Sequence, residues 1–357
     1  MINVTKSYLP PIEEYQKYLA GIWTNSWLTN HGPLVQELEH KLKEYLGVEN
    51  LLFVSNGTIA LQLAIKALDL KGEIITTPFS YVATAASIIW ENCTPVFADI
   101  ENKSFCVNPE EIEKHINSKT SAILATHVYG NACNVSEIEK IAQKHNLKVI
   151  YDGAHAFGIT INGNSIFNFG DVSTISFHAT KLFHTIEGGA IITKDKKLAE
   201  KLYLYRSFGH IADDYYSVGI NGKNSEFHAA MGLCNLPRVD EIVDNRKKTV
   251  LLYKSLLNGS KIFFPEKHSR QSINNSYFPV VFENKETLLS VRKALLENEV
   301  STRRYFYPSL NNLPYLNTKY KCPVSENIAE RVLCLPLYFD LNPIDVERIC
   351  KIVNSVI

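Results

Sequence analysis

The sequence predicts an α/β fold built on a mostly parallel sheet. Short apolar runs rich in β-branched residues recur through the first two-thirds of the chain, and helical patterns separate most of them. Continuous apolar runs are typical of strands covered on both faces, and alternation with helices favours parallel pairing. Seven strands are expected, at 51–55, 73–78, 94–100, 121–130, 148–154, 172–177 and 189–193. The last two follow each other almost directly, so we expect that pair to be antiparallel.

The helices between these strands carry recognisable signals. Asn108 is a candidate N-cap, with Pro109 at the first helical position and Glu111 placed to complete a capping box. Over 135–142, apolar residues recur at three- and four-residue spacing, which predicts a helix with one buried face.

The pattern changes at about residue 223. A long helical stretch follows, in which Pro237 is expected to cause a bend. Beyond it come a strand-like run at 277–282, a helical run, the extended segment 301–308 and a terminal helix. We therefore expect a large domain over 1–240 and a smaller α+β domain over 241–357.

Composition excludes several classes of function. The chain has 357 residues, with 37 Lys plus Arg against 37 Asp plus Glu, so it lacks the charge bias of nucleic-acid or anionic-membrane binding. No apolar run is long enough for a signal peptide or a membrane span. Seven cysteines, none spaced as CxxC, argue against disulfides and zinc. We expect a cytoplasmic protein with no metal.

A candidate phosphate site lies in "VSNGTIAL", where a predicted strand meets a helix. The first amides of a helix attract anions, Gly57 allows close approach and Thr58 adds a hydroxyl. An ordinary cap formed by Asn56 explains the same residues equally well. The turn is not a Walker loop, and GxGxxG occurs nowhere in the chain.

Three further polar or aromatic residues follow predicted strands at the same sheet edge, where open α/β sheets bind ligands. Asp152 ends an apolar strand, where it either caps a turn or pairs with a cation such as a pyridinium N–H. His155 follows it, and on its own indicates a buried structural histidine. Tyr81 begins a helix, where it either packs in the core or stacks on a flat ring.

Lys181 in "SFHATKLFHTIEGGA" follows a buried strand, where a charged ammonium is poorly solvated. A desolvated lysine has a lowered pKa and can form an imine, whereas most lysines extend into solvent. Ser176 and the glycines at 188–189 indicate close backbone packing around a ligand. A phosphate cradle, a ring stacker, an acid for a ring nitrogen and an imine-forming lysine together predict a site for pyridoxal 5′-phosphate.

These motifs resemble those of the DegT/StrS-type nucleotide-sugar aminotransferases over essentially the whole chain. "SNGTIAL", "YVATA", "THVYG", "YDGAHAFG", "SFHATKLFHTIEGGA" and "GINGKNSEFHAAMGL" appear in the family's order. The resemblance implies the aspartate aminotransferase-like fold, PLP-dependent transferase fold type I. Its large domain has a mixed, mostly parallel seven-stranded sheet and is joined to a smaller α+β domain.

The resemblance also implies individual roles. Lys181 carries the cofactor as an imine, Asp152 pairs with its ring nitrogen, Tyr81 stacks on the ring and His155 approaches its phenolic oxygen. The phosphate is held by three residues of the same subunit and one of its neighbour, which makes the active unit a homodimer: Gly57, Thr58, Ser176 and, from the neighbour, Asn221.

The chain departs from the family pattern in two places. Leu182 replaces the asparagine that commonly follows the lysine, and Lys223 and Asn224 replace an Arg-Met pair. Both changes bear on substrate contacts more than on the cofactor.

Three basic residues are candidates to bind a substrate carboxylate or pyrophosphate, because forked guanidinium groups suit both: Arg303 and Arg304, with His127. Structural roles explain them equally well.

The resemblance implies a function. L-Glutamate gives its amino group to the cofactor, and the pyridoxamine phosphate form passes it to a nucleotide-linked keto sugar. The motifs are most similar to those of members that aminate C4 of dTDP-4-keto-6-deoxyglucose for O-antigen synthesis. Amination at C3, or of a UDP- or GDP-linked sugar, is the alternative. A non-catalytic regulator would lack Lys181 or Asp152, and a nicotinamide oxidoreductase would carry the glycine fingerprint.

Overall fold

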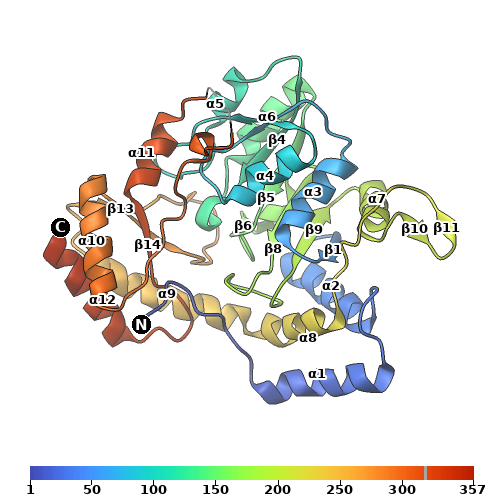
Figure 1. Cartoon of the computed structure of the whole chain (residues 1–357), viewed down its shortest axis with the longest axis horizontal. Coiled ribbons are helices and arrows are strands. Elements are labelled where there is room, and N and C mark those ends of the chain that lie inside the picture. Colours follow the sequence, from blue (N-terminus) through green and yellow to red (C-terminus); the bar gives the residue numbers. More distant parts are fainter. Residues whose placement is uncertain (317–319) are drawn as a thin grey trace.

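A seven-stranded sheet lies at the centre of the structure (Figure 1). The structure is a computed structural model, and it describes residues 1–316 and 320–357. In spatial order the strands are β1 (Asn50–Val54), β9 (Gly189–Thr193), β8 (Val172–Ser176), β5 (Lys148–Asp152), β4 (Thr120–Thr126), β2 (Glu73–Thr76) and β3 (Thr94–Phe97).

The strand directions within this sheet agree with those predicted from the sequence. β9 runs antiparallel to both β1 and β8, and the other neighbouring pairs are parallel. All seven predicted strands form, and the predicted antiparallel arrangement of the last two is confirmed.

Helices and apolar side chains cover both faces of the sheet. Along β1, Leu51 and Phe53 join one buried cluster while Leu52 and Val54 join another, as the two-residue period of a strand requires. The surrounding helices are α2 (Pro33–Leu46), α3 (Gly57–Ala67), α4 (Val82–Trp90), α5 (Pro109–Lys114), α6 (Val135–His145) and α7 (Lys196–Arg206). Burial on both faces explains why the strands show no alternation in sequence.

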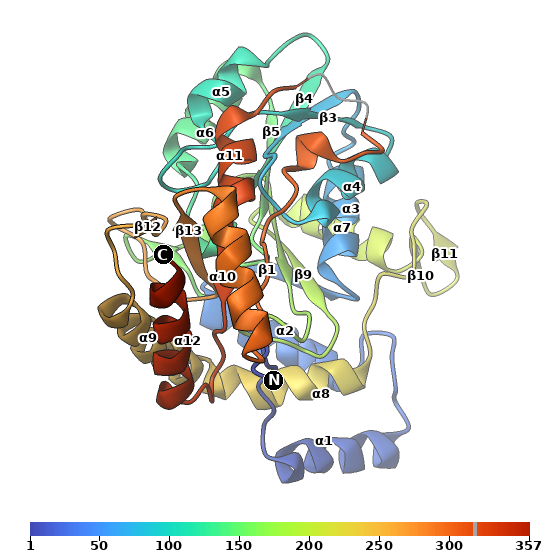
Figure 2. The same ribbon diagram turned by 60° about the vertical axis from the view of Figure 1, so that its left-hand side comes forward.

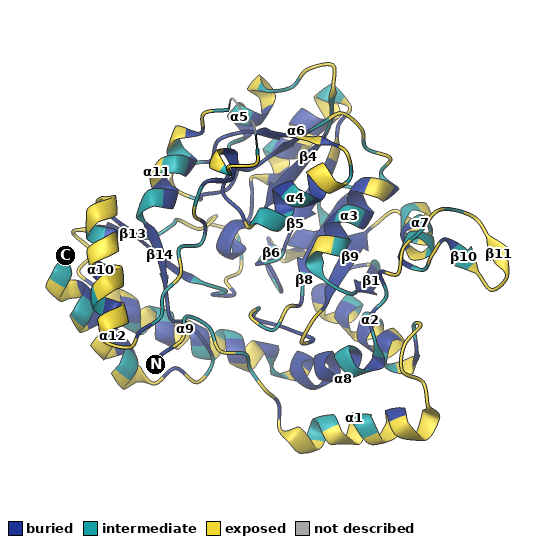
Figure 3. Ribbon diagram, in the orientation of Figure 1, coloured by how far each residue is buried: buried dark blue, intermediate teal, exposed yellow. Residues whose placement is uncertain are grey.

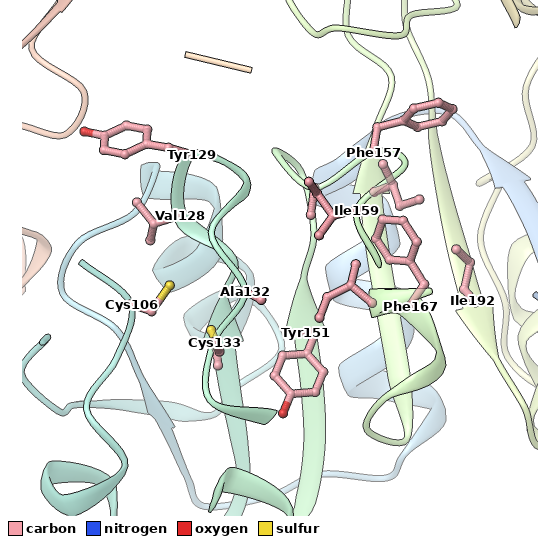
Figure 4. Close-up of a cluster of buried hydrophobic side chains, with 14 of the residues drawn as sticks. Cys106, Val128, Tyr129, Ala132, Cys133, Tyr151, Phe157, Ile159, Phe167 and Ile192 are labelled. Carbon is pink, nitrogen blue, oxygen red and sulfur yellow. The ribbon is translucent and has the colours of Figure 1, made fainter. Parts of the chain in front are cut away.

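Part of the larger cluster lies between β5 and the neighbouring loops (Figure 4). Tyr151, Phe157 and Phe167 point into it, together with the thiols of Cys106 and Cys133. All seven cysteines are free and buried. They behave as small apolar side chains.

The predicted long helix is interrupted at Pro237. α8 (Glu226–Asn235) leads into a 3₁₀ turn, η3 (Leu236–Arg238), and then into α9 (Val239–Leu256). Proline cannot donate the helical hydrogen bond, which accounts for the interruption.

The C-terminal third forms a three-stranded antiparallel sheet against helices (Figure 2). Its elements are β12 (Ile262–Phe263), β13 (Phe278–Phe282), α10 (Lys285–Glu297), η4 (Leu310–Asn312), α11 (Pro323–Arg331), β14 (Val332–Leu335) and α12 (Pro343–Val356). A separate hydrophobic cluster fills the space between this sheet and α9, α10 and α12, and Ile2 at the N-terminus also contributes to it. α11 and η4 pack instead against clusters shared with the large sheet. The division at 240/241 stays a proposal; it falls at the start of α9.

The remaining elements are short, apart from α1, and η1 and η2 among them are buried. They are α1 (Ile12–Asn25), η1 (Val128–Gly130), the two-stranded pair β6 (Thr160–Ile161) and β7 (Asn164–Ser165), η2 (Ile166–Asn168), and the hairpin of β10 (His210–Ile211) and β11 (Asp214–Tyr215). The hairpin projects from the body, and α1 lies outside α8 (Figures 1 and 3). Within residues 1–316 and 320–357, no helix is both long and apolar enough to cross a membrane.

The capping box predicted at α5 does not form. Asn108 caps the helix through a bond from the Glu110 amide, but its own amide donates to the Asp99 carbonyl. Glu111 instead accepts a hydrogen bond from Lys114. The Asn108 amide, with which Glu111 would have completed the box, is already bonded to the Asp99 carbonyl.

Candidate active site

A cavity of about 650 Å³ opens at the edge of the sheet where the parallel strands end. Its lining comes from the loops after β1, β2, β5 and β8 and from the C-terminal segments around 277 and 303–306. It brings together eight predicted site residues from distant parts of the chain: Gly57, Thr58, Tyr81, Asp152, His155, Ser176, Lys181 and Arg303.

One end of the cavity is shaped for an anion. α3 begins at Gly57, and the Asn56 side chain caps it by accepting from the Ile59 amide, which leaves the first two amides to face outward. A Cβ on Gly57 would lie 2.9 Å from Cβ of Ser176, so any larger residue would push the turn away from β8. Ser176, at the end of β8, adds its hydroxyl beside this turn.

Lys181 is held in the loop between β8 and β9. Its amide donates to the His178 carbonyl, and its Nζ lies 3.3 Å from the Tyr277 hydroxyl. Burial lowers the pKa of Lys181, and the nearby Asp152 charge opposes that shift. A lowered pKa increases the neutral fraction of the amine, which is the nucleophilic form.

Asp152 ends β5 on the cavity wall. Its Oδ1 accepts from the Ala154 amide at 3.1 Å, and its Oδ2 accepts from the Thr84 hydroxyl at 2.8 Å. Burial raises the pKa of Asp152, while these two hydrogen bonds and the Lys181 charge oppose the shift. A carboxylate fixed in this way is suited to receive a cationic N–H.

His155 presents a defined tautomer to the cavity. Its Nδ1 accepts from the Tyr129 amide at 3.3 Å, and burial holds its pKa well below the usual value, so the neutral ring carries its proton on Nε2. The ring stacks on Phe306 with centroids 5.6 Å apart.

Tyr81 precedes α4 as its N-cap residue and remains 55% exposed while lining the cavity. A flat ligand can therefore reach its ring.

The other predicted residues do not line this cavity. His127 is fully buried, stacks on Tyr151 and accepts from the Cys133 amide, and burial lowers its pKa to about 3, so it offers no charge to a substrate. Arg304 points away and binds the carbonyls of Ala329 and Glu330. We therefore do not retain either as a substrate contact.

Asn221 is exposed at the base of the β10–β11 hairpin, where it pairs with Ser207. The predicted contact of Asn221 is with the phosphate site of a neighbouring subunit, so it stays a prediction.

The two departures from the family pattern lie in packed regions. Leu182 is buried in the core, and Asn224 donates to the backbone carbonyls of Val54 and Glu187. Gly188 and Gly189 also meet protein, because Cβ atoms there would strike Thr185 and the Asn56 backbone. The close packing expected around a ligand is thus against protein atoms: Gly188 packs against Thr185, and Gly189 packs against the loop before α3.

Comparison with known proteins identifies the family. The sequence profile of the DegT/DnrJ/EryC1/StrS aminotransferases matches residues 11–354. The chain belongs to this family. It is 43% identical over 99% of both chains to dTDP-4-amino-4,6-dideoxy-D-glucose transaminase of Shigella dysenteriae. It is 41% identical to the Escherichia coli transaminase of that name, over 98% of this chain and 97% of that protein.

A solved structure agrees with this assignment. DesI, determined in the presence of its TDP-sugar product, superposes with a TM-score of 0.94 at 30% identity, over 99% of this chain and 92% of that one. Family membership makes the chain an aminotransferase that uses pyridoxal phosphate, and the predicted fold type I is confirmed.

The cavity fits that cofactor. The Gly57 cradle suits the phosphate, His155 offers an N–H, Asp152 offers a carboxylate for the ring nitrogen and Lys181 offers an amine. These residue assignments are proposals.

Sequence reasoning missed several cavity residues. Tyr277 lies immediately before β13, and its hydroxyl contacts Lys181, which is 96 residues away in sequence. His178 and Glu187 also line the cavity and lie 3.5 Å apart. Nearness to the lysine in sequence was the only signal for that pair.

Proposed function

We propose that this enzyme transfers the amino group of L-glutamate to C4 of dTDP-4-keto-6-deoxyglucose, giving dTDP-4-amino-4,6-dideoxyglucose. The cavity that joins Lys181 to Asp152 and the Gly57 turn carries the aminotransferase part of the proposal. The acceptor is supported by 43% identity, over 99% of both chains, to the Shigella transaminase.

Lys181 is proposed as the residue that holds the cofactor and moves the proton. When bound, pyridoxal phosphate supplies a carbon that accepts amines and a ring that takes up electrons from the substrate carbon. The neutral Nζ of Lys181 would act as a base that takes up a proton and, once protonated, as an acid that returns it. Tyr277 keeps that nitrogen at the cavity wall.

Asp152, His155 and the Gly57 turn are proposed to orient the cofactor. Asp152 would receive the ring N–H, His155 would donate from Nε2 to the phenolic oxygen, and the α3 amides with Ser176 would bind the phosphate. These contacts would hold the ring at both ends, and the Lys181 amine would then approach it in one orientation.

Arg303 is proposed to bind an anionic group of the substrates. It lines the cavity, with its guanidinium 5.3 Å from the centroid of the Tyr305 ring. The carboxylate of glutamate and the pyrophosphate of a nucleotide sugar are both suited to a forked donor.

We further propose a homodimer. The β10–β11 hairpin exposes apolar side chains that a monomer would leave in water: Phe208, Ile211, Tyr215, Tyr216, Val218 and Ile220. A second copy of the chain would cover them, and Asn221 at the hairpin base would then reach the neighbour's phosphate site. Sedimentation equilibrium should give twice the chain mass.

A cytoplasmic location and a role in O-antigen synthesis belong to the same proposal. All seven cysteines are free and buried, which suits a reducing compartment.

The acceptor is tested with a panel of keto sugars and glutamate as donor. The dTDP-linked 4-keto-6-deoxy sugar should give the highest kcat/KM, above 3-keto isomers and above UDP- and GDP-linked 4-keto sugars. Mass spectrometry and NMR of the product locate the new amine. A preference for another sugar would overturn the acceptor while leaving the aminotransferase assignment intact.

A further inference from the structure

Three buried hydroxyl groups form a chain that ends on Asp152. Thr126 Oγ1 donates to Ser80 Oγ at 3.1 Å, Ser80 Oγ lies 2.8 Å from Thr84 Oγ1, and Thr84 Oγ1 donates to Asp152 Oδ2 at 2.8 Å. The hydroxyl residues are at most 2% exposed. They come from the end of β4, the loop after β2, and α4, so tertiary structure brings them together.

The protons in this chain point one way. Each hydroxyl has one proton to give, and that of Thr84 goes to the carboxylate. The Thr84 oxygen must then accept from Ser80, whose oxygen accepts from Thr126. Every donor is aimed at Asp152. Chains of hydrogen bonds aligned in one direction polarise and strengthen one another.

This direction suits an ionised Asp152. An ionised carboxyl only accepts, so it can use the Thr84 proton on Oδ2 and the Ala154 amide on Oδ1 together. Burial alone favours the neutral acid, and Lys181 is the charged group that acts on Asp152 from across the cavity. The hydroxyl chain provides stabilisation from the protein side that remains when Lys181 is neutral.

We propose that Thr84, supported by Ser80 and Thr126, is a positioning residue that keeps Asp152 ionised and oriented toward the ring nitrogen of the cofactor. The inference rests on the proposed role of Asp152. Thr84 acts through the carboxylate and does not itself contact the cofactor. Loss of its hydroxyl would leave Oδ2 unpaired and free to rotate or to take up a proton.

Thr84→Val tests this, because valine keeps the shape and removes the hydroxyl. The dissociation constant of pyridoxal phosphate from the apo-protein should rise about tenfold or more, as expected for a lost hydrogen bond to a charged group. With cofactor saturating, kcat should fall more than KM for glutamate changes. Thr84→Ser should restore both, because the hydroxyl returns.

Thr76→Val is the matched control. Thr76 is a buried threonine on the neighbouring strand β2, and its hydroxyl donates to the Leu124 carbonyl instead. Its substitution should leave cofactor affinity within about threefold of the wild type. Equal losses in Thr76→Val and Thr84→Val, or no recovery with serine, would overturn the inference.

Asp152→Asn separates this inference from the proposed function. If Asp152→Asn weakens cofactor binding and turnover but Thr84→Val does not, the hydroxyl chain has no positioning role while the site assignment stands. If Asp152→Asn also changes neither quantity, the proposed role of Asp152 itself is wrong. Circular dichroism of each apo-variant confirms that it is folded.

Discussion

The Lys181 Nζ lies 3.3 Å from the Tyr277 hydroxyl, across the cavity from the strand ends. Burial raises the pKa of Tyr277, so the phenol stays protonated while the pKa of Lys181 is lowered. The phenol can thus accept from the ammonium or donate to the neutral amine. This contact holds the amine at the cavity wall.

Tyr277→Phe should therefore lower kcat about tenfold with little change in cofactor affinity. The ring that packs against His155 and Tyr305 is kept, and only the hydroxyl is lost. Steady-state kinetics and cofactor titration measure the two effects. Tyr253→Phe removes another buried hydroxyl, one bonded to Pro336, and should leave kcat unchanged. An unaffected kcat in Tyr277→Phe would contradict a role for this contact.

Gly57→Ala should weaken cofactor binding without unfolding the protein. The added methyl would lie 2.9 Å from Cβ of Ser176, so the turn and strand must separate where the phosphate is expected. We expect a rise of about tenfold or more in the dissociation constant of the cofactor, measured by fluorescence titration. Gly21→Ala, on α1 with open space around it, should bind the cofactor normally.

Arg303→Gln should raise KM for a substrate by about tenfold, because a charged hydrogen bond to an anion is lost. Measuring KM for glutamate and for the sugar nucleotide separately shows which anion Arg303 binds. Arg304→Gln should instead lower the melting temperature, because Arg304 binds the backbone at the end of α11. Unchanged KM values for both substrates in Arg303→Gln would exclude it from the site.

His127 should make the protein acid-sensitive. Burial lowers its pKa to about 3, whereas an unfolded histidine titrates near about 6.5. Between these values the unfolded chain binds a proton that the folded chain does not, so the unfolding free energy falls as pH drops. His127→Gln should reduce that fall by about 3 kcal/mol between about pH 7 and 4.

Urea titrations at several pH values measure this slope. His40→Gln, at an exposed position on α2, serves as the control for replacing a histidine with glutamine. The same slope in His127→Gln and the wild type would show that His127 is not buried in its neutral form.

The strands of the sheet could be predicted because each one is marked by the residues of its own short segment. Each strand is a short apolar run whose residues are buried on both faces, as Leu51 and Leu52 illustrate, and this pattern survives in the sequence. Asp152 and Lys181 could be found for a related reason, since charged residues directly after buried strands are unusual. The capping box predicted at Asn108 does not form because the Asn108 amide bonds to the carbonyl of Asp99, a residue outside the helix that the local sequence pattern does not include.

The rest of the site required tertiary structure. Tyr277 belongs to a segment that reads only as the start of a strand, and no spacing rule connects it to Lys181. Arg303 and Arg304 are adjacent in an extended segment, where neighbouring side chains point to opposite sides. Only one of the two could face the cavity, and the sequence did not indicate which one.

The absorbance spectrum of the purified protein with pyridoxal phosphate, before and after glutamate, tests the central claim most directly. The wild type should show a visible band that glutamate removes, and Lys181→Ala should show neither the protein-linked band nor turnover. Lys267→Ala, at an exposed lysine outside the cavity lining, should behave like the wild type. A Lys181→Ala variant that keeps the band and its turnover would contradict the account.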